Sequence, residues 1–307
     1  MTPTPTPQRL TIADLCIYPI KALPGVHVRQ GLAKMEGLAH PTLPQLRDRS
    51  FMVVDARTGK FLTLRTHAAA FSKISLTLDE ASGVIELNAP GEDQPLRLDV
   101  SATSATPSSG SQSLEQMHSK VWEWEGYASV VDREWFSRVM GCDVCLVSAN
   151  LDMHRPVEQE YAPQPTTTRF SDGFPYLIAF QESLVDLFED TYGDLAGSMM
   201  PRFRANVVVK GGTPWQEDRI RRLQCQESGV AFDLTKPCSR CTVPTVDPAT
   251  GVVDRRVAEL LRSRRSGGVL GWTEGPKGFN NAAFFGVNAC VDPAGVGRLI
   301  SVGEDLI

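Results

Sequence analysis

Short apolar segments with the alternation of β-strands, separated by turn residues, run through the first part of this 307-residue chain. Strands are expected at residues 10–19, 50–55, 61–64 and 74–78, with a turn at residues 56–59. Many short strands with regular turn signals are typical of antiparallel barrels and sandwiches. The N-terminal part is therefore predicted to form a β-barrel-like unit.

A second unit of similar character is expected from about residue 150. A helix at 132–140, ended by Gly141, and a strand at 142–148 complete the first unit. The later segments comprise an amphipathic helix at 181–188 and strands at 203–209, 229–234 and within 284–307. We predict a mainly β (α+β) chain of two β-barrel-like units with a few helices, divided as 8–149 and 150–307. A Ser/Thr/Gly-rich flexible loop is expected at about 101–114.

Composition narrows the class of protein. No apolar run approaches the ~20 residues that a membrane helix needs, so no membrane span is predicted. Residues 1–7, which alternate Thr and Pro after Met1, lack the features of a targeting segment, and we expect a cytoplasmic protein. The net charge of −5 argues against a nucleic-acid partner bound by bulk electrostatics.

Seven scattered cysteines favour reduced thiols over a disulfide framework. Two pairs have CxxC spacing, Cys142 with Cys145 and Cys238 with Cys241, and such a pair can bind zinc, form a redox disulfide or offer one sulfur to a transition metal. A structural zinc site would need both pairs, yet the first lies on a predicted strand, where i and i+3 point to opposite faces. We read that first pair as core cysteines. The second pair also lacks the βαβ setting of a thioredoxin-like motif.

The segment at residues 237–251, PCSRCTVPTVDPATG, resembles the signature of the MOSC superfamily, the molybdenum-cofactor sulfurase C-terminal domain. Further segments resemble, in the same order, the amidoxime-reducing proteins and their bacterial relatives, in which a β-barrel precedes MOSC. These segments are 18–25, 46–54, 170–176, 202–208 and 285–288. The resemblance covers essentially residues 8–307 and implies a molybdenum cofactor (molybdenum-molybdopterin) bound between the two units.

The resemblance also implies roles for individual residues. Cys241 matches the cysteine that ligates molybdenum, and Cys238 is then a small neighbour rather than a ligand. The cofactor ends in a phosphate, for which guanidinium and ammonium groups are suited. The positions that match the family's cofactor-binding residues are Lys21, Arg49, Arg204, Ser239 and Arg240.

Other positions match less completely or depart from the family. Asp172 matches and could relay protons to a leaving water, although an Asx turn ahead of Gly173 is an equally good interpretation. Ala22 replaces a usual serine after the lysine. Gly173 and Phe174 replace small hydroxyl residues, so cofactor contacts there would come from backbone amides. Asn206 and Asn288 fit the pattern and could instead tie loops together.

The implied activity is reduction of N-hydroxylated substrates such as amidoximes, hydroxylamines and N-hydroxylated bases. Electrons are expected from a separate protein, such as a ferredoxin, a cytochrome b5-like protein or a flavin reductase, because the chain has no flavin, nicotinamide or iron–sulfur motif. The alternative is a cofactor carrier or sulfur-transfer module, as in the sulfurases. Those proteins pair MOSC with a pyridoxal-phosphate domain, for which this chain has no room.

Overall fold

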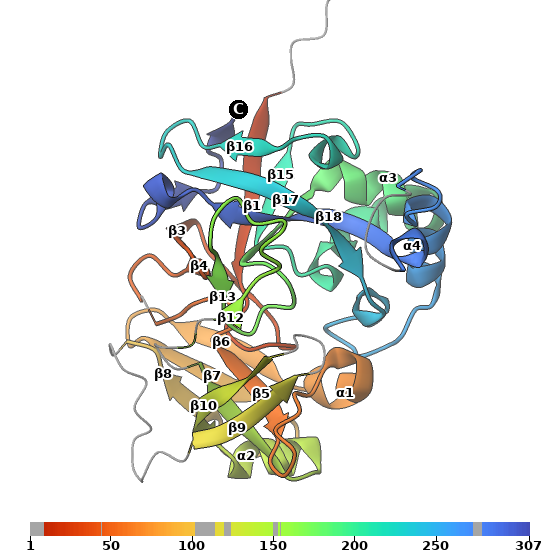
Figure 1. The fold of residues 1–307 in the computed structure, drawn as a ribbon. Coiled ribbons are helices and arrows are strands. Elements are labelled where there is room, and N and C mark those ends of the chain that lie inside the picture. Colours follow the sequence, from red (N-terminus) through yellow and green to blue (C-terminus); the bar gives the residue numbers. More distant parts are fainter. Residues whose placement is uncertain are drawn as a thin grey trace, which may run out of the picture.

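The computed structural model describes residues 9–43, 45–101, 114–119, 124–149, 153, 155–272 and 278–307. The N-terminal tail and nearly all of the loop predicted at 101–114 lie outside the described residues. Figure 1 shows two β-rich regions, one above the other. The predicted mainly β architecture is confirmed, but its sheets remain open and do not close into barrels.

The upper region is built on one large sheet with the strand order β16-β17-β18-β14-β15-β1-β2, and β20 also pairs with β1. These strands are β1 (Leu10–Ile17), β2 (Val26–His27), β14 (Tyr176–Phe180), β15 (Val207–Lys210), β16 (Arg222–Gln224), β17 (Ala231–Arg240), β18 (Ala283–Val291) and β20 (Asp305–Leu306). Strands β14 and β15 are parallel, whereas β14 and β18 are antiparallel. All five residues of β14 are buried, as expected for a central strand covered on both faces.

Both ends of the chain contribute to the upper region. Strand β1 pairs with β15 and β20 and runs down the middle of the molecule (Figure 1). A smaller sheet has the order β19-β3-β4, formed by β3 (Gln30–Lys34), β4 (Gly37–Ala39) and β19 (Leu299–Ser301). The first strands therefore belong to the sheets of the C-terminal half, and the sequence division at residues 149 and 150 stays a prediction.

The lower region contains two sheets and two helices. One sheet has the order β5-β11-β10-β9 and the other the order β6-β7-β8. The elements are β5 (Phe51–Asp55), β6 (Ser75–Asp79), β7 (Val84–Asn88), β8 (Leu96–Asp99), β9 (Leu114–Ser119), β10 (Trp124–Asp132), β11 (Val144–Ser148), α1 (Leu64–Phe71) and α2 (Glu134–Met140). Phe71, Trp135 and Phe136 join the strands in one hydrophobic core.

Helices cover one face of the large sheet, at the right of Figure 1. They are α3 (Gln181–Tyr192), η1 (Gly193–Arg202) and α4 (Arg256–Arg265). Shorter elements complete the described chain: η2 (Gln216–Asp218), η3 (Val243–Thr245), η4 (Phe279–Asn281), η5 (Pro293–Gly295) and the hairpin β12 (Arg155–Pro156) with β13 (Thr167–Thr168). Within the described ranges, none of the helices combines the length and apolarity that a bilayer crossing requires.

Three local predictions are wrong. The strand expected at residues 61–64 is reduced to an isolated bridge between Phe61 and Val54, because α1 begins at Leu64 and buries its first and last residues on one face. The strand expected at 203–209 begins only at Val207, since a turn precedes it. Cys142 is exposed rather than in the core, because it precedes β11, whereas Cys145 within β11 is buried.

Candidate functional site

Three of the four described non-glycine residues with positive φ lie where the sequence predicts cofactor contacts. Ala22, Arg49 and Arg204 have φ of 73°, 48° and 59°. Left-handed conformations cost side-chain-bearing residues roughly 1 kcal/mol or more each and persist only where the surroundings enforce them. Local propensity does not explain this clustering, so tertiary contacts must hold these loops.

Arg49 is fixed by a buried carboxylate. Its Nη1 pairs with Oδ2 of Asp48, whose side chain is 0% exposed. Asn206 reinforces the pair, because its Nδ2 donates to Oδ1 of Asp48 at 2.8 Å and its Oδ1 accepts from the backbone N–H of Leu177 at 3.1 Å. The Asn206 amide also donates to the carbonyl of Cys16 at 3.2 Å. The side chain of Asn206 thus ties β1, the Asp48 turn and β14 together.

Arg204 is buried against an aromatic ring. Its guanidinium carbon lies 4.2 Å from the ring centroid of Tyr18, and that of Arg49 lies 5.1 Å from the same centroid. Nη1 of Arg204 donates to the carbonyl of Leu23 at 2.7 Å, while its Nη2 is buried and has no hydrogen-bond partner. Burial lowers the pKa of Arg204, and the nearby charge of Arg49 lowers it further.

Lys21 and Asp172 form a pair beside these arginines. Nζ of Lys21 donates to the carbonyl of Phe170 at 2.9 Å and to Oδ1 of Asp172. Burial lowers the pKa of Lys21, although Asp172 opposes that shift. Partial desolvation by the surrounding protein acts to raise the pKa of Asp172, but the charge and hydrogen bond of Lys21, followed by the charge of Arg49, lower it to about 2. Because the Asp172 side chain is 79% exposed, solvent screens part of this attraction.

The cysteine motif begins within β17 and turns out of the sheet after Arg240. Cys238 is partly buried against the cluster beneath α3 and α4, whereas Cys241 is exposed. Nη1 of Arg240 donates to the sulfur of Cys238 at 3.1 Å, and its Nη2 donates to the carbonyl of Phe203 at 2.9 Å. The sulfur of Cys241 accepts the backbone N–H of Val243 at 3.4 Å.

The loop after the motif is fixed from η1. Nη2 of Arg202 donates to Oδ2 of Asp247 at 2.8 Å, and its Nη1 donates to the carbonyl of Thr245 at 3.2 Å. Ser239, one residue before Arg240, is exposed. Cys241 therefore lies on a loop whose two ends are tied down, with its sulfur accessible.

Unmatched positive charge marks this region. Lys21, Arg49, Arg204 and Arg240 face only two carboxylates, Asp48 and Asp172, in the contacts described above. Nη2 of Arg204 and Nε of Arg240 are buried donors without a partner. Because buried polar groups are almost always hydrogen-bonded, such donors indicate a missing acceptor. The residues present fit a ligand with phosphate-like oxygens next to a thiolate.

The remaining predicted residues lie close by but contribute differently. Phe174 is 4% exposed and packs with Val157 and Cys290, so its side chain is part of the core. A Cβ on Gly173 would lie 3.8 Å from Oδ1 of Asn288, which places this backbone beside β18. Tyr18 and Asp48 also belong to the site, but the sequence did not predict them. No sequence pattern indicates that both side chains lie buried between loops.

Across the described residues, no group of three or more His, Cys, Asp and Glu side chains is close enough to share a metal ion. The exposed sulfur of Cys241 is nevertheless accessible to a metal ion at the candidate site.

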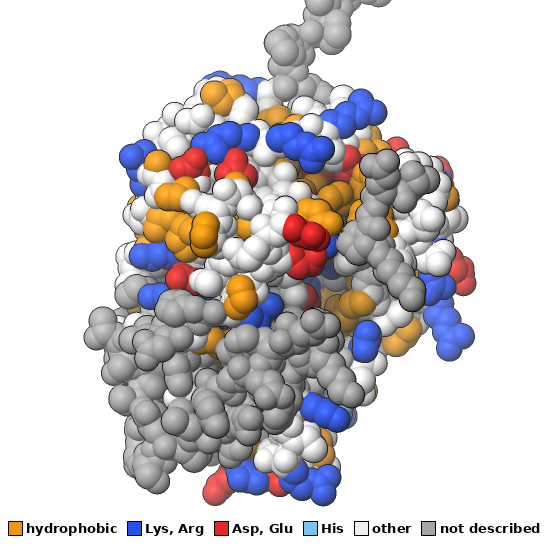
Figure 2. Space-filling view, in the orientation of Figure 1, with side chains coloured by type: hydrophobic (Ala, Val, Ile, Leu, Met, Phe, Trp, Pro, Cys, Tyr) orange, Lys and Arg blue, Asp and Glu red, His pale blue; other side chains and the backbone are white. Residues whose placement is uncertain are grey.

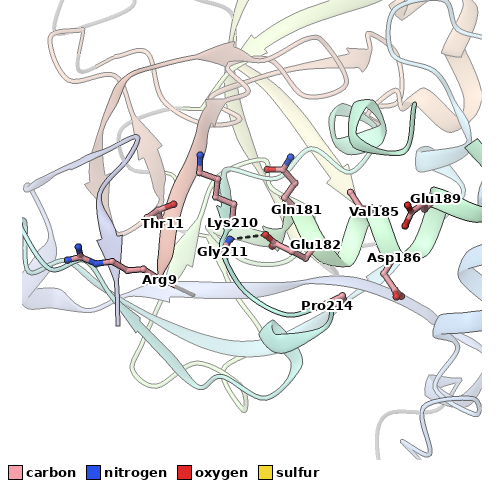
Figure 3. Close-up of a pocket in the computed structure, with 10 residues that line it drawn as sticks. All are labelled: Arg9, Thr11, Gln181, Glu182, Val185, Asp186, Glu189, Lys210, Gly211 and Pro214. Carbon is pink, nitrogen blue, oxygen red and sulfur yellow. Dashed lines mark hydrogen bonds between the residues drawn. The ribbon is translucent and has the colours of Figure 1, made fainter. Parts of the chain in front are cut away.

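One cavity lies away from these residues. A groove of about 540 Å³ runs between β1, the N-terminal half of α3 and the segment after β15 (Figure 3). In it Glu182 accepts the backbone N–H of Gly211 at 2.8 Å. Its lining includes Arg9, Lys210, Asp186 and Glu189, and none of the predicted site residues. Oε2 of Glu182 in this groove is also buried without a partner. We place the candidate site at Cys241 because cations outnumber carboxylates there, whereas charges of both signs line the groove.

The outer surface has no single sign of charge on the face in view. Figure 2 shows Lys and Arg side chains distributed around this face, with acidic side chains near its centre, in the region of the β12–β13 hairpin. Glu158 and Glu160 of that hairpin's loop are exposed. The side chains of Lys21 and Arg204 at the candidate site, in contrast, are buried.

Two family models match the chain. One, described as the MOSC N-terminal beta barrel domain, matches residues 9–143, and the other, described as the MOSC domain, matches residues 165–306. Together they include every residue of the candidate site described above.

Similar curated proteins extend over most of the chain. Mitochondrial amidoxime reducing component 2 of Macaca fascicularis is 28% identical over 263 residues, which are 83% of this chain and 72% of that protein. Mitochondrial amidoxime-reducing component 1 of Mus musculus is 28% identical over 262 residues, 83% of this chain and 71% of that protein. Molybdenum cofactor sulfurase of Solanum lycopersicum is 22% identical over 276 residues, 84% of this chain but 32% of that protein.

Proposed function

The chain belongs to the MOSC family, and from this premise we propose that it is a molybdenum-cofactor-dependent reductase of N-hydroxylated compounds supplied with electrons by an external donor. The observation that carries the proposal is the pair of buried, partnerless guanidinium donors on Arg204 and Arg240, which lie next to the loop that exposes Cys241. The names of the amidoxime-reducing relatives support the substrate class.

The side chains of the site would bind the metal and the cofactor. Cys241 would bind the metal through its thiolate, and Arg204, Arg240, Lys21 and Arg49 would bind the anionic end of the cofactor. When bound, the cofactor would supply two-electron redox chemistry. Arg240 would hold Cys238 away from the metal by donating to its sulfur at 3.1 Å.

Lys21 and Asp172 would take part in proton transfer to the substrate. Reduction of an N–OH group consumes two electrons and two protons and releases water, so the site needs a proton path. With a pKa lowered to about 2, Asp172 is ionised near neutral pH and holds the Lys21 ammonium. Because its pKa is so low, the exposed carboxylate would be protonated only briefly, and it would pass a proton from solvent to the leaving water rather than store one.

The electron donor would be a separate protein of the ferredoxin, cytochrome b5-like or flavin reductase class, docking transiently near Cys241. The test is turnover of benzamidoxime by the purified protein. We expect amidine formation with a chemical reductant and none with NAD(P)H alone. Direct oxidation of NAD(P)H by the pure protein would contradict the external-donor proposal.

The similarity to a molybdenum cofactor sulfurase favours a second candidate, a cofactor carrier or sulfur-transfer module. A carrier would bind the cofactor at the same arginines and release it to an acceptor. It would reduce neither benzamidoxime nor a hydroxylaminopurine under any reductant. The turnover experiment therefore separates the two candidates.

A further inference from the structure

The segment at residues 169–171 leads directly into Asp172, and three successive backbone carbonyls of this segment accept hydrogen bonds from two buried cations. Nε of Arg155 donates to the carbonyl of Arg169 at 3.0 Å, and its Nη2 donates to the carbonyl of Ser171. The intervening carbonyl, that of Phe170, accepts from Nζ of Lys21 at 2.9 Å. The segment is thus clamped by two buried cations.

Arg155 is well suited to such a clamp. It lies on β12, is 4% exposed, and sits opposite Thr168 in the β12–β13 ladder. A planar guanidinium presents donors in a fixed fork and can bind two carbonyls of one segment at once, whereas an ammonium is a compact single group. Burial lowers the pKa of Arg155 to about 10, which still leaves it charged near neutral pH.

We propose that Arg155 is a positioning residue that sets the Lys21–Asp172 pair by fixing the 169–171 backbone between its own guanidinium and Lys21. This inference rests on the proposed function, in which that pair manages protons. Arg155 would act on the reacting atoms only through the segment at 169–171. By fixing this backbone, it would position the Phe170 carbonyl, which accepts from Lys21, and the Asp172 residue that follows Ser171. Misplacement of such groups by about 1 Å can reduce turnover by about 100-fold.

The test compares Arg155→Lys with Arg265→Lys in the holoenzyme. Arg265 is a matched control because it is also 4% exposed and its Nε donates to a backbone carbonyl, that of Phe284, at 3.4 Å, within the helix-covered side of the large sheet. We expect Arg155→Lys to lower kcat by roughly 10- to 100-fold with little change in KM. Backbone amide exchange in a peptide containing residues 169–172 should accelerate by about tenfold or more, a readout independent of activity.

In Arg265→Lys the same peptide should exchange as in the native protein. If the two variants affect kcat and the exchange of this peptide alike, the inference is wrong, because the change would then reflect the loss of any buried arginine. Melting temperatures of both variants show whether each is folded.

A double-mutant cycle with Asp172→Asn completes the design. If Arg155 acts through the Lys21–Asp172 pair, Arg155→Lys should lower kcat little further once Asp172 is replaced. Fully additive effects of the two substitutions on the free energy of activation would overturn the inference. Failure of the proposed function looks different. In that case even the native protein does not reduce benzamidoxime, while exchange in the 169–172 peptide still accelerates in Arg155→Lys and not in Arg265→Lys.

Discussion

At the scale of single residues, the candidate site is defined by positive charge that lacks an acceptor. Arg204 illustrates this, since one of its nitrogens donates to Leu23 and the other is buried with no partner. Lys21, Arg49 and Arg204 could be predicted as site residues only because they match the family motifs. Without that match, a lysine or an arginine in a sequence is most simply interpreted as a charge on the surface. Asp48 could not be found this way, since its burial arises from contacts with Tyr18 and Asn206.

Replacing Arg204 with methionine should weaken cofactor binding while leaving the chain folded. A hydrogen bond to a charged group contributes roughly 1.5–3 kcal/mol, so retention should fall about 10- to 100-fold. The measurement is molybdenum and pterin content after dialysis of protein from a competent host. Arg29→Met, at an exposed arginine, is the control and should retain the native content. Equal retention by both variants would remove Arg204 from the site.

At the scale of elements, η2 and α3 are joined by a buried carboxyl. Glu217 is 1% exposed, and the hydroxyl of Ser183 on α3 donates to its Oε2 at 2.7 Å. Burial raises the pKa of Glu217 from 4.5 to about 7, although the Ser183 hydrogen bond opposes the shift. The folded protein therefore keeps this group protonated at pH values where the unfolded chain has already released its proton.

A raised carboxyl pKa costs stability as the pH rises. Below pH 4.5 both states are protonated, so the free energy of unfolding is unaffected, and between pH 4.5 and about 7 it falls because only the folded state retains the proton. The loss due to this group is up to about 3 kcal/mol. Glu217→Gln should remove that part of the pH dependence in denaturant unfolding, whereas Glu227→Gln at an exposed position should not. If the free energy of unfolding varies with pH in the same way for the native protein and Glu217→Gln, this prediction is wrong.

Helices and strands were predicted correctly where the apolar periodicity was strong. The prediction failed where tertiary contacts determine the backbone conformation. The helix predicted at 181–188 lies within α3, and the strand predicted at 50–55 closely matches β5. The segment at 203–206 has strand-like composition, yet the backbone of Arg204 is left-handed there and its guanidinium packs against Tyr18. No local pattern encodes such a contact.

At the scale of the whole molecule, the two ends of the chain share sheets. Strand β1 pairs with β15 and β20, and β3 pairs with β19. Dividing the sequence at one residue into an N-terminal and a C-terminal unit cannot represent these strand pairings. No local sequence pattern indicates contacts between the two ends of the chain. They have a functional consequence: β1 leads into the loop of Lys21, while β17 leads into Cys241, so one sheet orients both sides of the candidate site.

The most direct test of the account is the molybdenum content and benzamidoxime reduction of Cys241→Ala, measured beside native protein and Cys238→Ala from the same host. The account predicts that Cys241→Ala loses turnover and most of its metal, because the exposed thiolate is the proposed ligand. Cys238→Ala should keep most of both, since its sulfur is held by Arg240. Full molybdenum and full activity in Cys241→Ala would contradict the central claim.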